Sequence, residues 1–123
     1  MRKVLVTGSR DWPYPESVYA ALFKQYNVYD KFILIHGDCP NGADAIAKQW
    51  ILDNPTIAVE DPHPADWERF GKSAGFKRNA EMILCQPDVV LGFRMNMSKG
   101  TSHTLGLAQD AKIPSLTYDV YTQ

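Results

Sequence analysis

Two short apolar runs early in the chain each stop at a glycine, and a segment with helical spacing follows each of them. The first run covers residues 3–7 before Gly8, and the second covers residues 32–36 before Gly37. A run of about five residues that ends in a turn is typical of a strand buried on both faces of a sheet. Because parallel strands need helical crossovers, this repeat predicts an α/β fold.

The rest of the chain continues the alternation of strands and helices. We expect helices at about 16–26, 43–52, 73–85 and 101–111, and further strands at 56–59, 88–93 and 115–118. Gly75 weakens the first turn of the third helix, so its start could shift toward Lys77. Residues 61–71 are predicted to form a long irregular loop, which in a small domain usually has a function. Residues 118–123 are predicted to form a short tail. The prediction is a compact Rossmann-like, doubly wound domain with a mostly parallel five-stranded sheet and helices on both faces.

Length and charge narrow the class of protein. The 123 residues suit one domain, 1–123, and the formal net charge of −1 argues against a nucleic-acid or membrane-surface partner. The first ten residues lack the apolar stretch of a signal peptide or membrane span. Cys39 and Cys85 lack C-x-x-C spacing, which fits a reducing compartment. We therefore expect a cytoplasmic protein.

Three glycine-containing turns are predicted at the same edge of the sheet. In an open parallel sheet, ligands bind beyond the carboxyl ends of the strands, where the strand order reverses. If the order is 3-2-1-4-5, the turns at Gly8 and Gly100 face each other there. Gly42 and Gly100-Thr101 stand at helix starts, where backbone N–H groups can bind an anion. Neither G-x-G-x-x-G nor a Walker P-loop is present, which disfavours an ordinary NAD or ATP enzyme, and no cofactor is expected.

Charged side chains in or beside these turns are candidates for ligand contacts. Arg10 and Arg78 are the stronger candidates for phosphate, because Arg10 follows a glycine turn and Arg78 lies near a helix start, where a cation opposes the helix dipole. Trp12 and Trp67 could each stack on a base or cap the core. The other basic residues are Lys72, Lys77, Arg94 and Lys99, and the carboxylates that could hold ribose or activate water are Asp38, Asp44, Asp66 and Glu81. For Asp44, helix capping is the competing interpretation.

The three histidines do not suggest a metal site. His36 ends a predicted buried strand and is interpreted as a hydrogen-bonded core residue, His63 lies in the proline-rich loop, and His103 lies at a helix start. Their sequence neighbourhoods lack an evident set of cysteine or carboxylate ligands. No metal is expected.

Several motifs, in order along nearly the whole chain, resemble the YspA-like branch of the SLOG superfamily. The resemblance implies a Rossmann-like fold that binds nucleotides or nucleotide-derived ligands. It also relates the chain to the LOG phosphoribohydrolases, which cleave the N-glycosidic bond of nucleoside 5′-monophosphates. The motifs are V-T-G-S-R-D-W at 6–12, H-G-D-C-P-N-G-A-D-A at 36–45, P-A-D-W at 64–67, G-K-S-A-G-F-K-R-N-A-E-M at 71–82 and K-G-T-S-H-T at 99–104.

The resemblance carries over to some residues and fails at others. Arg78 and Met82 fall on the R-K-x-x-M helix of those enzymes, and Gly100-Thr101 matches the G-T of P-G-G-x-G-T-x-x-E. The glycine pair is replaced at 95–97, and Thr104 stands at the position of the catalytic glutamate. A threonine cannot supply a carboxylate base or a stabilising negative charge.

These observations favour binding over hydrolysis. We expect a nucleotide or ADP-ribose-like ligand in the crevice, bound by a sensor or a sequestering protein. The alternative is a nucleoside 5′-monophosphate N-glycoside hydrolase, with Glu81, Asp38 and Arg78 as catalytic candidates. The resemblance also allows a homodimer. The predicted ligand-binding residues are Gly8, Ser9, Arg10, Gly37, Asp38, Gly42, Asp44, Trp67, Arg78, Asn79, Lys99, Gly100 and Thr101.

Overall fold

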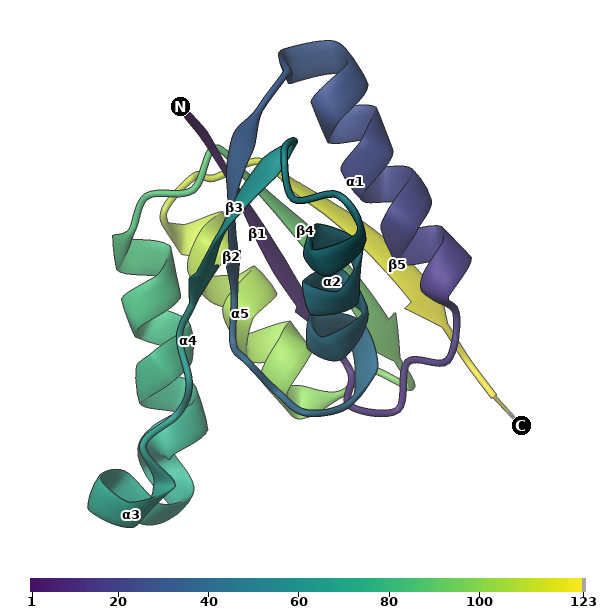
Figure 1. Cartoon of the computed structure of the whole chain (residues 1–123). Helices are drawn as coiled ribbons and strands as arrows, with labels where there is room; N and C mark the ends of the chain where they lie inside the picture. The colour runs from purple at the N-terminus through teal and green to yellow at the C-terminus, as the bar shows by residue number, and fades with distance from the viewer. Residues whose placement is uncertain (123) are drawn as a thin grey trace.

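One five-stranded sheet forms the centre of the computed structural model, which describes residues 1–122 (Figure 1). Every strand pairing in it is parallel, and the order is β3-β2-β1-β4-β5. The predicted order is therefore confirmed, and the direction of winding reverses between β1 and β4. The strands are β1 (Arg2–Gly8), β2 (Phe32–His36), β3 (Ala58–Pro62), β4 (Val89–Met95) and β5 (Ser115–Val120).

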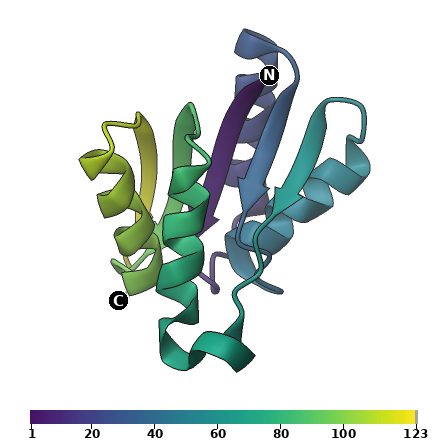
Figure 2. The same cartoon turned by 90° about the vertical axis from the view of Figure 1, so that its left-hand side faces the viewer.

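Helices cover both faces of the sheet. α1 (Pro15–Tyr29) and α2 (Gly42–Asp53) lie on one face, and α4 (Ala74–Leu84) and α5 (Lys99–Asp110) lie on the other. The short α3 (Trp67–Phe70) and the 3₁₀ turn η1 (Gly71–Ser73) connect β3 to α4. Figure 2 shows α3 beyond the end of the sheet toward which the strand arrows point. Nothing in residues 1–122 forms a helix long and apolar enough to cross a membrane.

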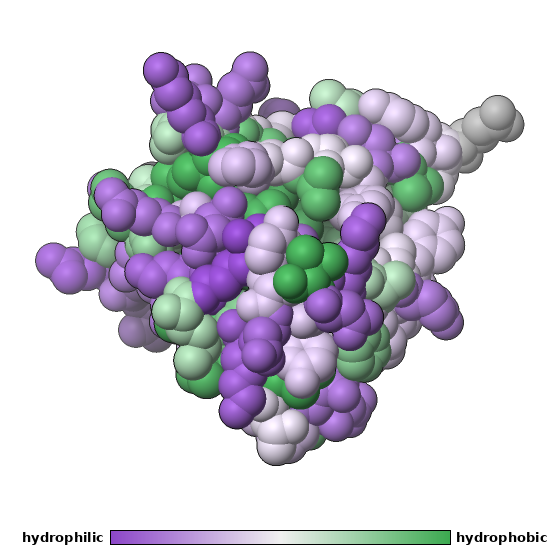
Figure 3. Space-filling model, turned by 90° about the horizontal axis from the view of Figure 1, so that it is seen from above, coloured by the Kyte–Doolittle hydropathy of each residue, from purple (hydrophilic) through white to green (hydrophobic). Residues whose placement is uncertain are grey.

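Side chains of alternating direction on the central strands divide the core into two parts. Val4 and Val6 of β1 pack toward α1 and α2, whereas Leu5 packs toward α4 and α5, and all three are fully buried. Phe32 stacks on Trp50 with ring centroids 5.9 Å apart. The end of the molecule seen in Figure 3, which is the top in Figure 1, has mostly hydrophilic side chains with separate hydrophobic ones between them.

The boundaries of several elements differ from the sequence prediction. β3 covers 58–62 rather than 56–59, and it can include Pro62 because it is an edge strand. Residues 67–71 of the predicted loop are helical, as part of α3 and η1. Gly75 lies inside the first turn of α4 without delaying its start, and β5 extends two residues beyond Tyr118. The predicted tail beyond β5 includes Gln123, which lies outside the described residues.

Candidate ligand-binding site

A cavity of about 410 Å³ lies at the carboxyl end of the sheet, where β1 and β4 are neighbours. Four segments form its wall: the turn after β1, the β2–α2 connection, the stretch from α3 into α4, and the start of α5. The crevice predicted from the strand order is therefore present. Its lining residues are Thr7, Gly8, Ser9, Arg10, Asp11, Cys39, Asp44, Trp67, Lys72, Gly75, Phe76, Arg78, Asn79, Met82, Ser98, Gly100 and Thr101.

Arg78 connects α4 to the end of β2. Its Nη1 donates to the carbonyl oxygen of Gly37 at 2.5 Å, and its Nε donates to the amide oxygen of Asn79 at 2.9 Å. A guanidinium has five N–H donors, so three remain for a ligand after these two bonds within residues 1–122. Arg78 is therefore both a structural tie and an available cation at the cavity.

Asn79 connects the same helix to α5. Its amide nitrogen lies 3.4 Å from the Gly100 carbonyl oxygen and 3.3 Å from Nδ1 of His103, and the residue is only 4% exposed. A buried side-chain amide needs such partners to offset its desolvation. Asn79 consequently fixes the start of α5 relative to α4.

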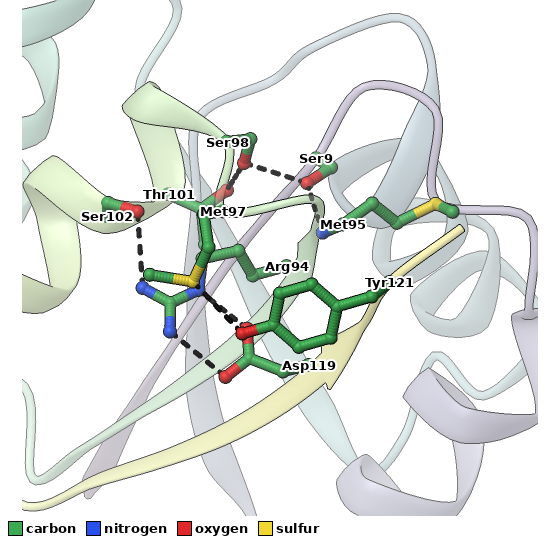
Figure 4. A network of polar contacts seen from close by, with 9 residues as sticks. All are labelled: Ser9, Arg94, Met95, Met97, Ser98, Thr101, Ser102, Asp119 and Tyr121. Atoms are coloured by element: carbon green, nitrogen blue, oxygen red, sulfur yellow. Dashed lines mark hydrogen bonds and ion pairs between the residues drawn. The ribbon is translucent and has the colours of Figure 1, made fainter. Parts of the chain in front are cut away.

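A chain of hydroxyl groups links the turns after β1 and β4 (Figure 4). Ser9 Oγ accepts from the backbone N–H of Met95 at 2.8 Å and lies 2.8 Å from Ser98 Oγ. Ser98 donates in turn to Thr101 Oγ1 at 3.0 Å. Since Ser98 has one hydroxyl proton, Ser9 must be the donor between the two serines. These bonds hold the two turns at a fixed separation.

The first turn of α5 offers backbone donors to the cavity. The first backbone hydrogen bond of this helix runs from the Ser102 N–H to the Ser98 carbonyl oxygen at 3.0 Å. The N–H groups of Gly100 and Thr101 come before this first bond, so they have no acceptor inside the helix. Both residues line the cavity. Amides at a helix start and the helix dipole together favour an anion.

Asp44 is a buried carboxyl group at the cavity. It is 6% exposed and accepts from the Cys39 backbone N–H at 3.3 Å. Burial raises the pKa of Asp44 above its ordinary value, although His36, the Cys39 amide and Arg78 act in the opposite direction. Burial, together with nearby Asp44, likewise raises the pKa of the Cys39 thiol. Both effects favour uncharged groups on this wall.

His36 stabilises the turn that carries Asp38. Its Nδ1 accepts from the backbone N–H of Asp38 at 2.9 Å, so its Nε2 carries the proton and donates to Glu60 at 2.7 Å. His36 is fully buried. The interpretation of this histidine as a hydrogen-bonded core residue is confirmed.

Aromatic residues border the opening of the cavity. Trp67 is 48% exposed, its ring centroid lies 5.7 Å from the Arg10 guanidinium carbon, and it packs against Gly75. Phe76 stands beside it in the lining and packs on His103. Trp12, in contrast, is 4% exposed and contacts Phe93, so it caps the core.

Nine of the thirteen predicted ligand-binding residues line the main cavity, and the other four lie beside it. Gly37 and Asp38 line a smaller adjoining pocket, and the Asp38 carboxylate pairs with Lys48 at 3.2 Å. Gly42 has φ +74°, and a side chain there would collide with Ser9 O, so its role in the fold is to let the two turns approach. Lys99 is exposed and lies outside the lining.

Two charged candidates have other partners. Glu81 lies outside the cavity lining, and its carboxylate is 3.4 Å from Nδ1 of His63. Arg94, which was expected near the crevice, pairs with Asp119 through bonds of 2.6 and 2.9 Å and also contacts Ser102, as Figure 4 shows. It connects β4, β5 and α5, and it does not line the cavity. That expectation is wrong because the Arg94 side chain leaves β4 toward β5.

Eight lining residues lie outside the predicted ligand-binding set: Thr7, Asp11, Cys39, Lys72, Gly75, Phe76, Met82 and Ser98. Thr7, Asp11 and Cys39 could have been found from the sequence, because each is next to a predicted ligand-binding residue. Gly75 was interpreted only as a helix-weakening residue, whereas it accommodates the Trp67 ring. The sequence neighbourhood of His63 showed no evident set of ligands, but in the fold His63 lies near Asp61 and Cys85.

A model of the YspA, cpYpsA-related SLOG family matches residues 2–70. This chain belongs to that family. The SLOG family assignment suggests a nucleotide-related function and a small ligand. A protein named "Gene 61 protein" from Mycobacterium phage D29 is 38% identical over 122 residues, covering 96% of this chain and 97% of the phage protein. No solved structure gives a significant match.

Thr104 stands at the position that the resemblance assigns to the catalytic glutamate of the phosphoribohydrolases. Thr104 is fully buried, and its hydroxyl donates to the Gly100 carbonyl oxygen at 3.3 Å. Its side chain therefore stabilises the first turn of α5 instead of facing the cavity.

Proposed function

We propose that this SLOG protein binds a nucleotide or a nucleotide-derived, ADP-ribose-like ligand in the cavity between β1 and β4, as a sensor or a sequestering protein. The observation that carries the proposal is the meeting of Arg10, Arg78 and Lys72 with the first amides of α5 in one cavity. A volume of about 410 Å³ is within the range of small-molecule sites.

The phosphate would bind among the cations and the start of α5. The Arg10 side chain has no hydrogen-bond partner within residues 1–122 and is exposed, and Arg78 keeps three donors. The Thr101 hydroxyl accepts from Ser98 and can still donate its own proton. Charge-assisted bonds from arginine to phosphate are stronger than neutral ones.

The nucleoside would lie toward the opposite wall. Asp44 could accept a bond from a ribose hydroxyl, and Trp67 and Phe76 offer aromatic surfaces to a base at the opening. The lining thus offers Trp67 and Phe76 to a base in addition to its cations and backbone amides for phosphate, which supports a whole nucleotide rather than phosphate alone as the ligand.

Hydrolysis of the N-glycosidic bond is the second candidate function, and one observation favours it. Asp44 is a buried carboxyl with a raised pKa at the cavity, which suits a general acid. The other candidates support it less, because Asp38 pairs with Lys48 and Glu81 lies outside the lining.

Binding is tested by calorimetry and thermal unfolding with AMP, ADP-ribose, adenosine and inorganic phosphate. A ligand at 100 times its Kd should stabilise the protein by about 2.7 kcal/mol. Arg10→Ala and Arg78→Ala should lose affinity for the phosphorylated ligands, whereas Arg69→Ala, an exposed residue outside the lining, should not. If the panel gives no shift, or if both cavity variants bind as the wild type does, the phosphate assignment is wrong.

The same samples separate binding from hydrolysis. Chromatography of AMP after incubation should show no free adenine if the protein only binds. Base release that Asp44→Asn abolishes would establish the hydrolase instead.

A further inference from the structure

We propose that Asp61, His63 and Cys85 form a binding site for one zinc-type divalent cation. Asp61 lies in β3, His63 follows that strand, and Cys85 directly follows α4. One ligand atom from each residue lies within 4.8 Å of the other two. None of the three lines the cavity described above, so this site is independent of the proposed function.

The spacing of the ligand atoms fits a tetrahedral ion. Zinc bonds of about 2.0–2.2 Å to nitrogen and oxygen and about 2.3 Å to sulfur put tetrahedral neighbours about 3.3 Å apart for N and O and about 3.6 Å for N and S. His63 Nε2 lies 3.2 Å from Asp61 Oδ2 and 3.8 Å from Cys85 Sγ. The ion could therefore bind with only small side-chain movements.

The imidazole of His63 is already oriented for this role. Its Nε2 faces Asp61 and Cys85, while its Nδ1 lies 3.4 Å from Glu81 Oε2. A carboxylate on the second ring nitrogen is the usual support of a metal-bound histidine, because it fixes the tautomer and raises the basicity of the ligand. The His63 backbone N–H also donates to the His36 carbonyl oxygen at 2.8 Å, and its side chain is 13% exposed.

The chemistry of the ligand set selects the cation. Sulfur and imidazole ligands favour zinc and similar transition metals over magnesium or calcium. Asp61 and Glu81 supply negative charge, and the nearby Lys3 ammonium donates to the Cys85 carbonyl oxygen at 2.9 Å. Asp61 is 44% exposed at its side chain, which leaves a path for the ion, and three protein ligands leave a fourth position for water.

Titration of the full chain with Co²⁺ tests the proposal. We expect one equivalent to bind with the visible absorption of a tetrahedral ion and a thiolate-to-cobalt charge-transfer band, and Zn²⁺ to displace it. Cys85→Ser should remove the charge-transfer band, whereas Cys39→Ser, the matched control, should keep it. The proposal is overturned if the wild type shows no such band, or if the band survives Cys85→Ser.

Two further variants separate a metal site from a simple ion-pair cluster. Asp61→Asn keeps the shape of a partly exposed side chain and should weaken Co²⁺ binding while retaining the charge-transfer band at saturation. Glu81→Gln should weaken binding about 10- to 100-fold, the usual effect of losing a supporting carboxylate. Circular dichroism of the metal-free variants verifies that they are folded. Unchanged Co²⁺ affinity in both folded variants would contradict the ligand assignment.

Discussion

The guanidinium group of Arg78 occupies the space beside the α-carbon of Gly37 where any other residue would carry a side chain. A Cβ atom at Gly37 would lie 2.5 Å from Nη1 of Arg78 and 3.0 Å from Oδ2 of Asp44. The absence of a side chain at position 37 therefore determines where the main cavity cation can lie.

Gly37→Ala should displace the Arg78 guanidinium without unfolding the protein. The obstructing atoms are the far end of a flexible side chain, which can move at small cost, but the bond to the Gly37 carbonyl oxygen would be disturbed. We expect AMP affinity in calorimetry to fall toward that of Arg78→Ala, with a small change in Tm. Wild-type affinity in a folded Gly37→Ala protein would refute this coupling.

Gly106→Ala should stabilise the protein by about 0.5–1 kcal/mol, because Gly106 lies inside α5 and an added methyl group would meet open space. Urea unfolding measures the change. AMP binding should be unaffected, so this variant also serves as the glycine-to-alanine control for position 37.

Ser9→Ala should destabilise the protein by about 1–3 kcal/mol. The substitution leaves the buried N–H of Met95 without its 2.8 Å acceptor and removes the hydroxyl that pairs with Ser98. Chemical denaturation measures the free energy of unfolding of Ser9→Ala and of the control Ser73→Ala, which removes an exposed hydroxyl. Equal losses in the two variants would show that the hydroxyl chain has no special role.

Asp44→Asn should be more stable than the wild type at neutral pH, by a margin that shrinks in acid. Because burial raises the pKa of Asp44 in the folded protein, its stabilising contribution is complete below the ordinary value of 3.8 and is lost as the pH rises through the raised value. Asparagine stays uncharged and can still accept from the Cys39 N–H. Unfolding curves at several pH values check this, and a margin that grows in acid would contradict it.

Trp67→Ala should weaken AMP binding and leave ribose 5-phosphate binding unchanged. Stacking of a base on an aromatic side chain contributes about 1–3 kcal/mol, and Trp67 is half exposed at the cavity opening. Calorimetry with the two ligands separates the base from the phosphate contribution. Parallel losses for both ligands would place Trp67 at the phosphate instead.

The strands and the edge of the sheet that forms the cavity were predictable because they depend on local patterns. Apolar runs that end at Gly8 and Gly37 define strands, and parallel crossovers then place the following turns at one edge. Ser9 and Thr101 could be assigned to the cavity on that basis alone, before any contact between them was known.

Side-chain direction and long-range contacts were not predictable in this way. Asp38 lies in the expected turn, but its carboxylate faces Lys48. This direction follows from the positive φ of Asp38 and from the position of α2. Phe76 reaches the cavity because α3 and α4 pack over the end of the sheet. His63 and Cys85 are 22 residues apart, and only the tertiary fold brings the residue after β3 next to the end of α4.

Arg78 and Asn79 are consecutive residues of α4, yet their side chains bond to segments on opposite sides of the β1–β4 pair, where the direction of winding reverses. Arg78 bonds to the end of β2, and Asn79 bonds to the first turn of α5. This one helical turn therefore sets the width of the cavity before any ligand arrives. A ligand would meet walls that are already ordered, so the entropy lost on binding would come mainly from the ligand itself, and selection among ligands would depend on size.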